Sequence, residues 1–515
     1  MAMLIMGGAI TPGAAANVLL VCPQPGSSTT CPTTAYASIQ GAVNAAASGD
    51  WVLVAPGDYH EQGVPGASEP AGVLIQTPWI HLRGMNRNTV IVDGTKTGSA
   101  GPCSGDQGAQ DPRARNGIDV YKTDGVYVQN LTTCNFLTGP NGGEGNEIWW
   151  NGGDGSGKIG MGPWWGSYLT ATSTYSNGVD PPFGDYGIFI SNSNGPGSVT
   201  NSYASNMGDA GYYVGACPDC NAVLDHVRAQ YSSLGFSGTN AGGHLLIENS
   251  EFDHNKTGPT QDSENNDDAP PPQNGQCPGG APGPLGTGIC DIWENNYIHD
   301  NNNPNVPGNS ANGLAGAAPI GTGVVFAGTE YIELHHNRIE HNGAWGALIV
   351  DQPYMGAPPP TSHCEGGTYV APAQLCYFPA FGNQVVANSF RANGGYGNPT
   401  NGDIGMITTP HNPGNCFHDN TDPAGLTSDP PNIQSPPYNP CGLPNTGPDP
   451  VLTAQVLCAT QLLAPCPSAP TASYPRPTTV KLHMPPPQPS MPNPCQDVPD
   501  NAWCQSGQPT SLAPR

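Results

Sequence analysis

Tyr186–Asn255 is a stretch that repeats itself, and the repeat decides the fold. It divides into three similar lines: YGIFISNSNGPGSVTNSYASN (186–206), AGYYVGACPDCNAVLDHVRAQ (210–230) and GFSGTNAGGHLLIENSEFDHN (235–255). Each line has a glycine beside a strand-length apolar run and closes on an amide (Asn206, Gln230, Asn255), and these amides are 24 and 25 residues apart. A fixed period in the twenties is typical of a solenoid whose turns stack on one another. We therefore expect an all-β fold, a right-handed parallel β-helix, with an amide ladder along one corner.

The ladder continues beyond this stretch with larger gaps. Asn301, Asn342 and Asn393 follow Asn255 at spacings of 46, 41 and 51 residues, each of which fits one turn plus an inserted loop. The insertions fall at about 257–287, 303–319 and 352–382. The first two leave the turn at the same point, so they should emerge on one edge and could wall a groove. Long loops on a rigid scaffold tend to carry function.

Composition agrees with this fold and limits the partners. Gly 70 and Pro 58 make up about a quarter of the 515 residues, which turn-rich solenoids tolerate and helix-rich folds do not. The chain has 14 basic and 39 acidic residues and a net charge of -25. This balance argues against nucleic acid or an anionic membrane surface as partner. It would also repel an acidic polysaccharide unless calcium or a local arginine cluster intervened. We expect a monomer.

The cysteine content predicts an oxidising compartment. Sixteen cysteines is an even number and a high one for a reducing cytosol. The CPDC stretch (217–220) could be a redox or metal motif, although a bridge that staples a turn is the favoured interpretation. We expect local disulfides between nearest neighbours: Cys22–Cys31, Cys103–Cys134, Cys217–Cys220, Cys277–Cys290, Cys364–Cys376, Cys416–Cys441, Cys458–Cys466 and Cys495–Cys504.

The two ends of the chain differ from the repeat region. Residues 1–17 are expected to be the remnant of a secretory signal peptide, the alternative being an ordinary unstructured terminus. No later run approaches the ~18 apolar residues of a membrane span. We therefore expect a secreted, extracellular protein that does not span a membrane. Residues 411–515 lose the period and become rich in proline, with six cysteines. They are expected to form an irregular, disulfide-tied tail.

The segment before the repeats, YASIQGAVNAAASGDWVLVAPGDYHEQ (36–62), carries a second signal. Ser38 can cap a short helix whose apolar residues share one face, which suits a lid over the first turn. Trp51–Ala55 then reads as a buried strand. The pattern S-I-Q-x-A-V, A-A, G-D, V-x-V-x-P-G and Y-x-E in this segment resembles the N-terminal module of the pectin lyase-like β-helix superfamily. The resemblance implies a β-helix over about residues 35–410.

The resemblance does not extend to an activity. The superfamily includes pectate and pectin lyases, polygalacturonases, pectin methylesterases, alginate lyases and epimerases, and many non-catalytic surface proteins. The sequence contains neither the paired-Asp motifs of the hydrolases, nor the QDTL and LGRPW motifs of the pectinesterases, nor the WIDH and RxPxxR motifs of the lyases. No catalytic residue is therefore carried over.

Aligning the turns by their amides predicts one cluster of chemical groups. Stacked strands are ~4.8 Å apart, so residues in one column can touch. Carboxylates and imidazoles together can act as general acid and base or bind a divalent metal, while an alternating surface ladder is the structural alternative. The first column is expected to contain Arg228, Asp253, His299, Glu340 and Arg391, and the next Ala229, His254, Asp300, His341 and Ala392.

Two other groups of residues are candidates for binding. The loop QDSENNDDAP offers hard oxygen ligands at alternating positions, Asp262, Glu264, Asn266 and Asp268, which could hold calcium; a solvated acidic loop is the alternative. Aromatic faces suit sugar rings. Candidate platforms are the pairs Trp149/Trp150 and Trp164/Trp165, in a Gly- and Trp-rich segment where the period breaks, and the outward pair Phe189 and Tyr213. The alternative is that these rings pack against the solenoid wall.

These features lead to one preferred function and one rival. The preferred function is a secreted carbohydrate-active β-helix that binds a polysaccharide along its turns. As an enzyme it would be a polysaccharide lyase or glycosidase, with Asp253, His299 and Glu340 as acid/base or metal-binding groups. Arg228 or Arg391 would neutralise a substrate carboxylate. The rival is a non-catalytic extracellular structural or adhesive protein, in which the same column is only surface.

Overall fold

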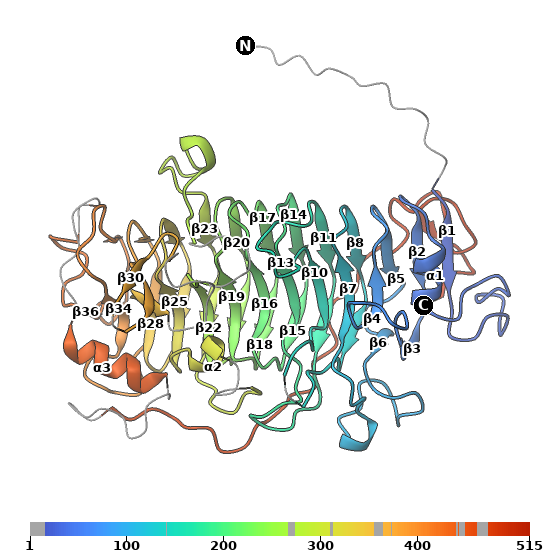
Figure 1. Cartoon of the computed structure of the whole chain (residues 1–515), viewed down its shortest axis with the longest axis horizontal. Coiled ribbons are helices and arrows are strands. Elements are labelled where there is room, and N and C mark those ends of the chain that lie inside the picture. The colour runs from blue at the N-terminus through green and yellow to red at the C-terminus, as the bar shows by residue number, and fades with distance from the viewer. Residues whose placement is uncertain are drawn as a thin grey trace, which may run out of the picture.

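The computed structural model describes residues 16–140, 142–265, 273–308, 313–354, 364–371, 373–438, 441, 449–460 and 472–514. Three long parallel sheets of 12, 11 and 10 strands form the walls of one elongated solenoid (Figure 1). The chain visits the sheets in a fixed order, so that β17, β18 and β19 form one turn and β20, β21 and β22 the next. The expected parallel β-helix is confirmed.

The strands are short because each turn bends sharply at three corners. The 12-stranded sheet contains β1 (Val18–Val21), β2 (Trp51–Val54), β5 (His81–Gly84), β8 (Val126–Gln129), β11 (Trp164–Ser167), β14 (Gly197–Thr200), β17 (Ala222–Asp225), β20 (Leu245–Glu248), β23 (Asp291–Glu294), β26 (Ile332–His335), β32 (Gln384–Val386) and β35 (Cys416–His418). The 10-stranded sheet contains β3 (Gly57–Tyr59), β6 (Val90–Asp93), β9 (Thr132–Cys134), β12 (Thr170–Thr172), β15 (Tyr203–Ser205), β18 (Arg228–Gln230), β21 (Glu251–Asp253), β24 (Tyr297–His299), β27 (Arg338–Glu340) and β33 (Ser389–Arg391).

The third wall and the smaller elements complete the described chain. The 11-stranded sheet contains β4 (Ala71–Ile75), β7 (Asn116–Tyr121), β10 (Ile148–Asn151), β13 (Ile188–Ser191), β16 (Ala210–Gly215), β19 (Leu234–Thr239), β22 (Thr257–Asp262), β25 (Thr322–Ala327), β28 (Trp345–Val350), β34 (Gly402–Ile407) and β36 (Ser428–Asp429). The smaller elements are the strands β29 (Gln352–Tyr354), β30 (Thr368–Val370), β31 (Leu375–Phe378), β37 (Cys504–Gln505) and β38 (Gln508–Pro509), and the helices α1 (Ile39–Ala45), α2 (Gly313–Ala317) and α3 (Pro450–Ala459). No helix among the described residues is long and apolar enough to cross a membrane.

The amide ladder runs through the corner between the 10- and 11-stranded sheets. Asn255, Asn301, Asn342 and Asn393 are joined by side-chain hydrogen bonds of 3.0, 3.3 and 3.1 Å, as the spacing predicted. Asn206 and Gln230 are not part of it, which corrects the sequence alignment. Asn255 Oδ1 instead accepts from the backbone of Ser232 at 3.0 Å, so the ladder position of that turn is Ser232.

A second ladder, not expected from the sequence, lies in the corner before the 10-stranded sheet. Asn296, Asn337, Asn388 and Asn420 are linked by side-chain hydrogen bonds of 3.0 Å each. Each asparagine also donates to a buried backbone carbonyl, as Asn337 does to Trp293 at 2.8 Å. Two buried corners of the solenoid therefore have their polar backbone groups satisfied by side chains of the next turn.

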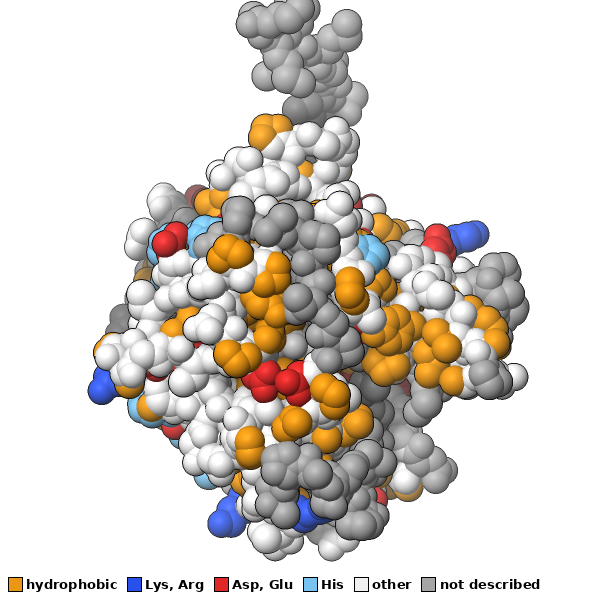
Figure 2. Space-filling view, turned by 90° about the vertical axis from the view of Figure 1, so that its left-hand side faces the viewer, with side chains coloured by type: hydrophobic (Ala, Val, Ile, Leu, Met, Phe, Trp, Pro, Cys, Tyr) orange, Lys and Arg blue, Asp and Glu red, His pale blue; other side chains and the backbone are white. Residues whose placement is uncertain are grey.

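The ends of the solenoid are covered by helices. Helix α1 lies over the first turn, and the Ser38 side chain accepts from Gly41 N at its start, as expected. At the far end α3 packs Leu452 and Ala459, both fully buried, against Trp345 of β28. Figure 2 looks onto this end and shows apolar and uncharged side chains with few lysines or arginines.

The Gly- and Trp-rich segment forms one more turn of the solenoid, lengthened by loops between its strands. Its strands β10, β11 and β12 pair in register with the turns before and after. Trp150 and Trp164 point into the core and are fully buried. Gly197 of the next turn lies over Trp164, where a Cβ would come within 2.0 Å of the ring. The register partners Ile118, Ile148 and Ile188 are 30 and 40 residues apart, whereas Ile188 and Tyr212 of the next pair are 24 apart. Inserted loops therefore break the period here, as the sequence indicated.

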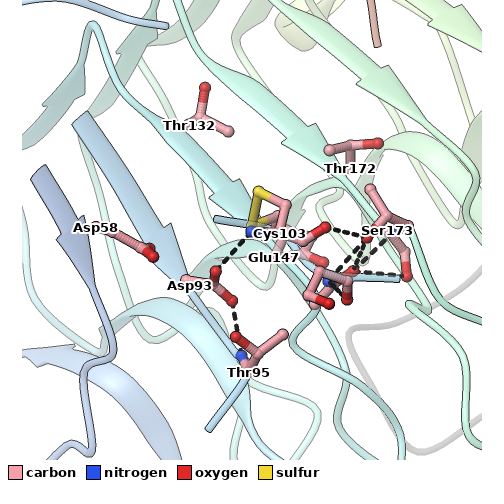
Figure 3. Close-up of a disulfide and its surroundings, with 12 residues drawn as sticks. Asp58, Asp93, Thr95, Cys103, Thr132, Glu147, Thr172 and Ser173 are labelled. Carbon is pink, nitrogen blue, oxygen red and sulfur yellow. Dashed lines mark hydrogen bonds between the residues drawn. A yellow bond between two sulfur atoms is a disulfide. The ribbon is translucent and has the colours of Figure 1, made fainter. Parts of the chain in front are cut away.

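Seven of the eight expected disulfides are present, including the bridge within CPDC. The eighth involves Cys466, which lies outside the described residues. Figure 3 shows Cys103, bonded to Cys134, beside Asp93, whose carboxylate accepts from Cys103 N at 2.6 Å and from Thr95 N at 2.7 Å. This many bridges fits an oxidising compartment.

The C-terminal region is ordered along the solenoid more than its composition suggests. Strands β35 and β36, beyond residue 411, still pair with β32 and β34. After α3, the chain at 472–494, which we call the strap, runs back along the solenoid toward the N-terminal end (Figure 1). There the hairpin of β37 and β38 packs Trp503 beside Trp51 and Met85 in one buried cluster.

Candidate functional site

The candidate site lies on the outer face of the 10-stranded sheet, where alternate residues of each strand point outward. The register places Gln230, Asp253, His299, Glu340 and Arg391 in one column. Four of these were expected. Arg228 was assigned to this column but lies in the neighbouring one, with Glu251, Tyr297 and Arg338.

The error in placing Arg228 has a simple cause. The alignment took the larger Val227 as the inward residue of β18, whereas the inward residue that pairs with Phe252 is the small Ala229. Arg228 nevertheless reaches Asp253, with Nε and Nη2 donating at 2.9 and 3.1 Å. The column also brings Gln230 Nε2 to Asp253 at 2.6 Å.

Asp253 is a fully buried carboxylate held in the ionised form. Burial would raise its pKa, but hydrogen bonds with His254 and Arg228 outweigh burial and hold the pKa below its usual range. The bond to His254 Nδ1, at 2.5 Å, raises the pKa of that imidazole in turn. Because its oxygens are taken up by these partners, Asp253 is better suited to orient Arg228 and His254 than to accept a proton from a substrate.

His299 is the residue best placed for proton transfer. Its Nε2 lies 3.2 Å from Glu251 Oε1 and its Nδ1 lies 2.8 Å from Asp300 Oδ2. Burial would lower its pKa, but these two hydrogen bonds outweigh burial and raise it. The ring also stacks on Tyr297 with centroids 3.8 Å apart. His299 is therefore an imidazole fixed between two partly exposed carboxylates, which favour its protonated form.

Glu340, one strand further along, is paired with an arginine of its own strand. Arg338 Nε and Nη2 each donate to Glu340 at 2.7 Å, and these bonds lower the pKa of Glu340. The guanidinium also lies over the Tyr297 ring at 4.3 Å. Arg391 pairs with Glu340 in register, is exposed, and has no ion-pair partner among the described residues.

The second expected column lies at the corner that follows these strands. His254, Asp300, His341 and Ala392 all have positive φ, between 53 and 58°, as does Tyr231. In the turn of β18, the residue of the second column is therefore Tyr231 and not the expected Ala229. Asp300 and His254 contact the site through His299 and Asp253. No contact joins the His341 side chain to the cluster among the hydrogen bonds and ion pairs of the described residues.

Only Asp262 and Glu264 of the four expected calcium ligands lie among the described residues, so the calcium loop stays a prediction. Asp262 is a buried strand residue that accepts from Thr239 Oγ1 at 2.9 Å, and burial raises its pKa to about 6. Glu264 follows β22 with its side chain half-buried, and Asn266 and Asp268 lie outside the described residues. Elsewhere, ligand atoms of Glu251, Asp253 and His299 lie within 4.8 Å of one another. A cation there would have to displace Arg228, which is 3.1 Å from Glu251.

The aromatic candidates divide by the direction of their side chains. Trp150 and Trp164 are buried in the core and cannot stack on a sugar. Trp149, Phe189 and Tyr213 form an outward row on the 11-stranded sheet, in the expected register, with Trp149 and Phe189 stacked at 4.7 Å. Tyr213 is itself buried, so only part of this row reaches solvent.

Trp165 belongs to an outward aromatic stack that the sequence analysis missed. On the 12-stranded sheet the rings of Trp51, His81, Tyr127 and Trp165 stack in order at 4.1, 4.3 and 4.4 Å. Trp79 lies 6.4 Å from Trp165 and is 46% exposed. The four residues are spread over 115 positions without a fixed spacing, since loops of different length separate them, so the periodicity gave no signal.

Comparison with known proteins gives only distant structural matches. No family model matches the chain, and no curated protein sequence matches it. Solved structures do match, among them the A-modules of two Azotobacter vinelandii mannuronan C-5 epimerases. The match to AlgE4 has 13% identity, covers 76% of this chain and 91% of that one, and has a TM-score of 0.43. The match to AlgE6 has 14% identity, covers 75% of this chain and 94% of that one, and has a TM-score of 0.42. Pectate lyase Pel9A matches at 13% identity, 81% and 82% coverage, and a TM-score of 0.36. The chain is a parallel β-helix protein, and likeness at this level assigns none of its residues a role.

Proposed function

We propose that this is a secreted protein that binds a polysaccharide along the outer face of its 10-stranded sheet and cleaves it by acid–base chemistry at His299. The observation that carries the proposal is the position of His299, with a carboxylate on each ring nitrogen. The disulfides support an extracellular site of action.

The geometry suits His299 to the role of general acid. The raised pKa of His299 favours the protonated ring, which can donate to the oxygen of a leaving sugar. Glu251, half-buried at 3.2 Å, or Asp300, at 2.8 Å, can move aside to expose one N–H. As His299 protonates the leaving oxygen, that carboxylate takes the proton lost by the attacking water, or by the carbon next to the uronate carboxyl, and returns it to His299. The reaction is cleavage of a glycosidic bond, either by hydrolysis or by β-elimination next to a uronate. The residues do not distinguish the two.

The charges of the face limit the substrate. Arg228 and Arg338 are each held by carboxylates of the protein, so neither is free to bind a substrate carboxylate. Arg391 is the exposed cation next to the cluster. With a net charge of -25, the protein favours a neutral polysaccharide or one with few acidic groups near Arg391.

One observation favours the rival function. The pairing of Arg228 and Arg338 with the acids around them is also what a stable surface ladder needs. A non-catalytic extracellular structural or adhesive protein is therefore the second candidate. In that case the ion pairs and disulfides serve only durability.

The test is an activity screen with matched variants. The wild type is incubated with alginate, polygalacturonate and neutral β-glucan, with and without calcium, and reducing ends and unsaturated products are measured. His299→Gln should lower the rate by about 10²–10⁴-fold. His418→Gln is the control, because His418 also pairs through Nδ1 with the following aspartate, at 2.8 Å, but lies on the 12-stranded sheet. Equal loss in both variants, or binding without turnover by the wild type, would refute a catalytic His299.

A further inference from the structure

The strap is held on the solenoid by asparagine side chains. Asn398, Asn206 and Asn88 each pair with the backbone of one strap residue, respectively Ser473, His483 and Gln488. In each pair the asparagine Nδ2 donates to the backbone carbonyl of the strap residue, at 3.2, 2.8 and 2.8 Å in that order. The asparagine Oδ1 accepts from the backbone N–H of the same strap residue, at 2.8, 3.1 and 2.9 Å. Because these contacts involve the backbone, they fix the path of the chain and not its side chains.

Both ends of the strap are anchored. Asn398 holds its start beside α3, and at the other end Arg83 Nη1 donates to the carbonyls of Pro494 and Gln496 at 3.1 and 2.7 Å. The hairpin that follows is closed by a disulfide at Cys495 and buries Trp503 completely. The strap is therefore a fixed part of the wall and not a lid.

The strap first passes the loop after β24, where Thr478 N and Lys481 N donate to Asn305 at 2.8 and 3.1 Å. From His483 onward it lies over the outer face of the N-terminal half of the 10-stranded sheet. Arg87 is 1% exposed and is held between that sheet and the strap, donating to Thr170 Oγ1 at 2.7 Å and to Pro489 O at 3.1 Å. Thr132, Thr170, Thr172, Tyr203 and Ser205 point outward from β9, β12 and β15, yet all are buried.

Exposure changes abruptly at β18. The side chains of Arg228 and Glu251 are 40% and 34% exposed, and those of Asp300 and Arg338 are 42% and 55% exposed. These residues belong to the candidate site. The outer face is thus covered from β9 to β15, whereas from β18 to β27 one of its two columns (Arg228, Glu251, Tyr297 and Arg338) reaches solvent. The other column (Gln230, Asp253, His299 and Glu340) is buried beside it.

The boundary is formed by His483 of the strap. Its ring stacks on Tyr231 at 3.9 Å, with an interplanar angle of 13°. Tyr231 in turn lies 5.6 Å from His254, which is 6.3 Å from His299. A continuous row of rings therefore leads from the strap to the proton donor of the proposed reaction.

We propose that the strap closes one end of the substrate groove, so that the site takes the end of a polysaccharide chain and releases short products. This inference rests on the proposed function. Strand β24, which carries His299, is two strands from β18, or about 10 Å from the boundary. Only a short piece of a chain lying along the solenoid axis fits on that side of His299. The rest extends toward β33, which is also two strands or about 10 Å from β24 but is the end that His483 does not close.

The first test compares the length of the polysaccharide, followed by viscosity, with the number of bonds cut, followed by reducing ends. The substrate is the polymer that is cleaved in the screen: alginate, polygalacturonate or β-glucan. Viscosity and reducing ends are measured over time. The wild type should release mono- to trisaccharide-sized products while viscosity falls slowly. An immediate fall in viscosity per bond cut would overturn the inference and leave the proposed function standing. Absence of cleavage on all three polymers would instead refute the proposed function.

The second test opens the groove. A protease recognition sequence is inserted after Met484, which is 70% exposed, and Asn206→Gly removes a clamp while glycine tolerates its φ of 66°. After cleavage, viscosity should fall several-fold faster per bond cut than before cleavage of the same protein. The control is Asn201→Gly with the same insertion, since exposed Asn201 also has positive φ, at 50°, but leaves the clamp intact. An unchanged product profile, with hydrogen exchange showing 478–491 released, would overturn the inference.

Discussion

Removing one rung of the amide ladder should destabilise the middle of the solenoid by about 4 kcal/mol. Asn301 is fully buried, and its side chain accepts from Asn255 N and Nδ2 at 3.3 and 3.0 Å. It also donates to Phe252 O at 3.0 Å and to Asn342 Oδ1 at 3.3 Å. Asn301→Ala deletes all four bonds and leaves their partners buried. At about 1 kcal/mol net for each bond, the loss is ~4 kcal/mol.

The assay is urea unfolding combined with hydrogen exchange. Each turn of a solenoid contacts mainly its neighbours, so amides of β21, β24 and β27 should exchange faster than those of β5 and β8. The control is Asn194→Ala at an exposed position, which should change stability by less than ~0.5 kcal/mol. If Asn301→Ala behaves like the control, the ladder contributes nothing net and the reasoning is wrong.

Three further predictions concern packing and charge. Gly197→Ala should destabilise by several kcal/mol, because its Cβ would lie 2.0 Å from the Trp164 ring, whereas Gly108→Ala, with open space around it, should be neutral; thermal unfolding compares them. Trp150→Ala should cost about 3–5 kcal/mol in urea unfolding, and a similar cost for the outward Trp149→Ala would contradict the observed directions of the two side chains. Because the folded pKa of His299 is raised, its stabilising pairs are complete below ~6.5 and lost as pH rises through the folded pKa. The stability difference between wild type and His299→Gln should therefore shrink from pH 6 to pH 9, and a difference that grows would reverse the sign of the argument.

Much of the site was within reach of the sequence. Asp253, His299, Glu340 and Arg391 follow the same inward position in each turn, so aligning the turns places them in one column. Arg228 was misplaced because the inward residue of β18 is the small Ala229. The alignment looked for a large hydrophobic residue at this position and chose Val227 instead. Glu251 and Tyr297 were missed because the alignment followed only one of the two outward residues of each strand.

Other parts of the site left no periodic signal. His483 is 252 residues after Tyr231 in the chain, and its docking depends on backbone contacts with Asn206 that any strap residue could make. The tail therefore read as irregular, although it covers half of one sheet. The Trp-rich turn gave no period for a related reason, since loops of unequal length separate its strands from those of the neighbouring turns.

The sequence by itself determined the solenoid: the period of 24 and 25 residues, the asparagines at 255, 301, 342 and 393, the helix at Ser38 and the local pairing of cysteines. These features are repeated or close in the chain, so spacing alone reveals them. Only the tertiary structure decided which outward side chains meet and where the face is open. Those contacts depend on the register across loops of unequal length and on a tail that returns along the whole solenoid, and neither is encoded in a local pattern.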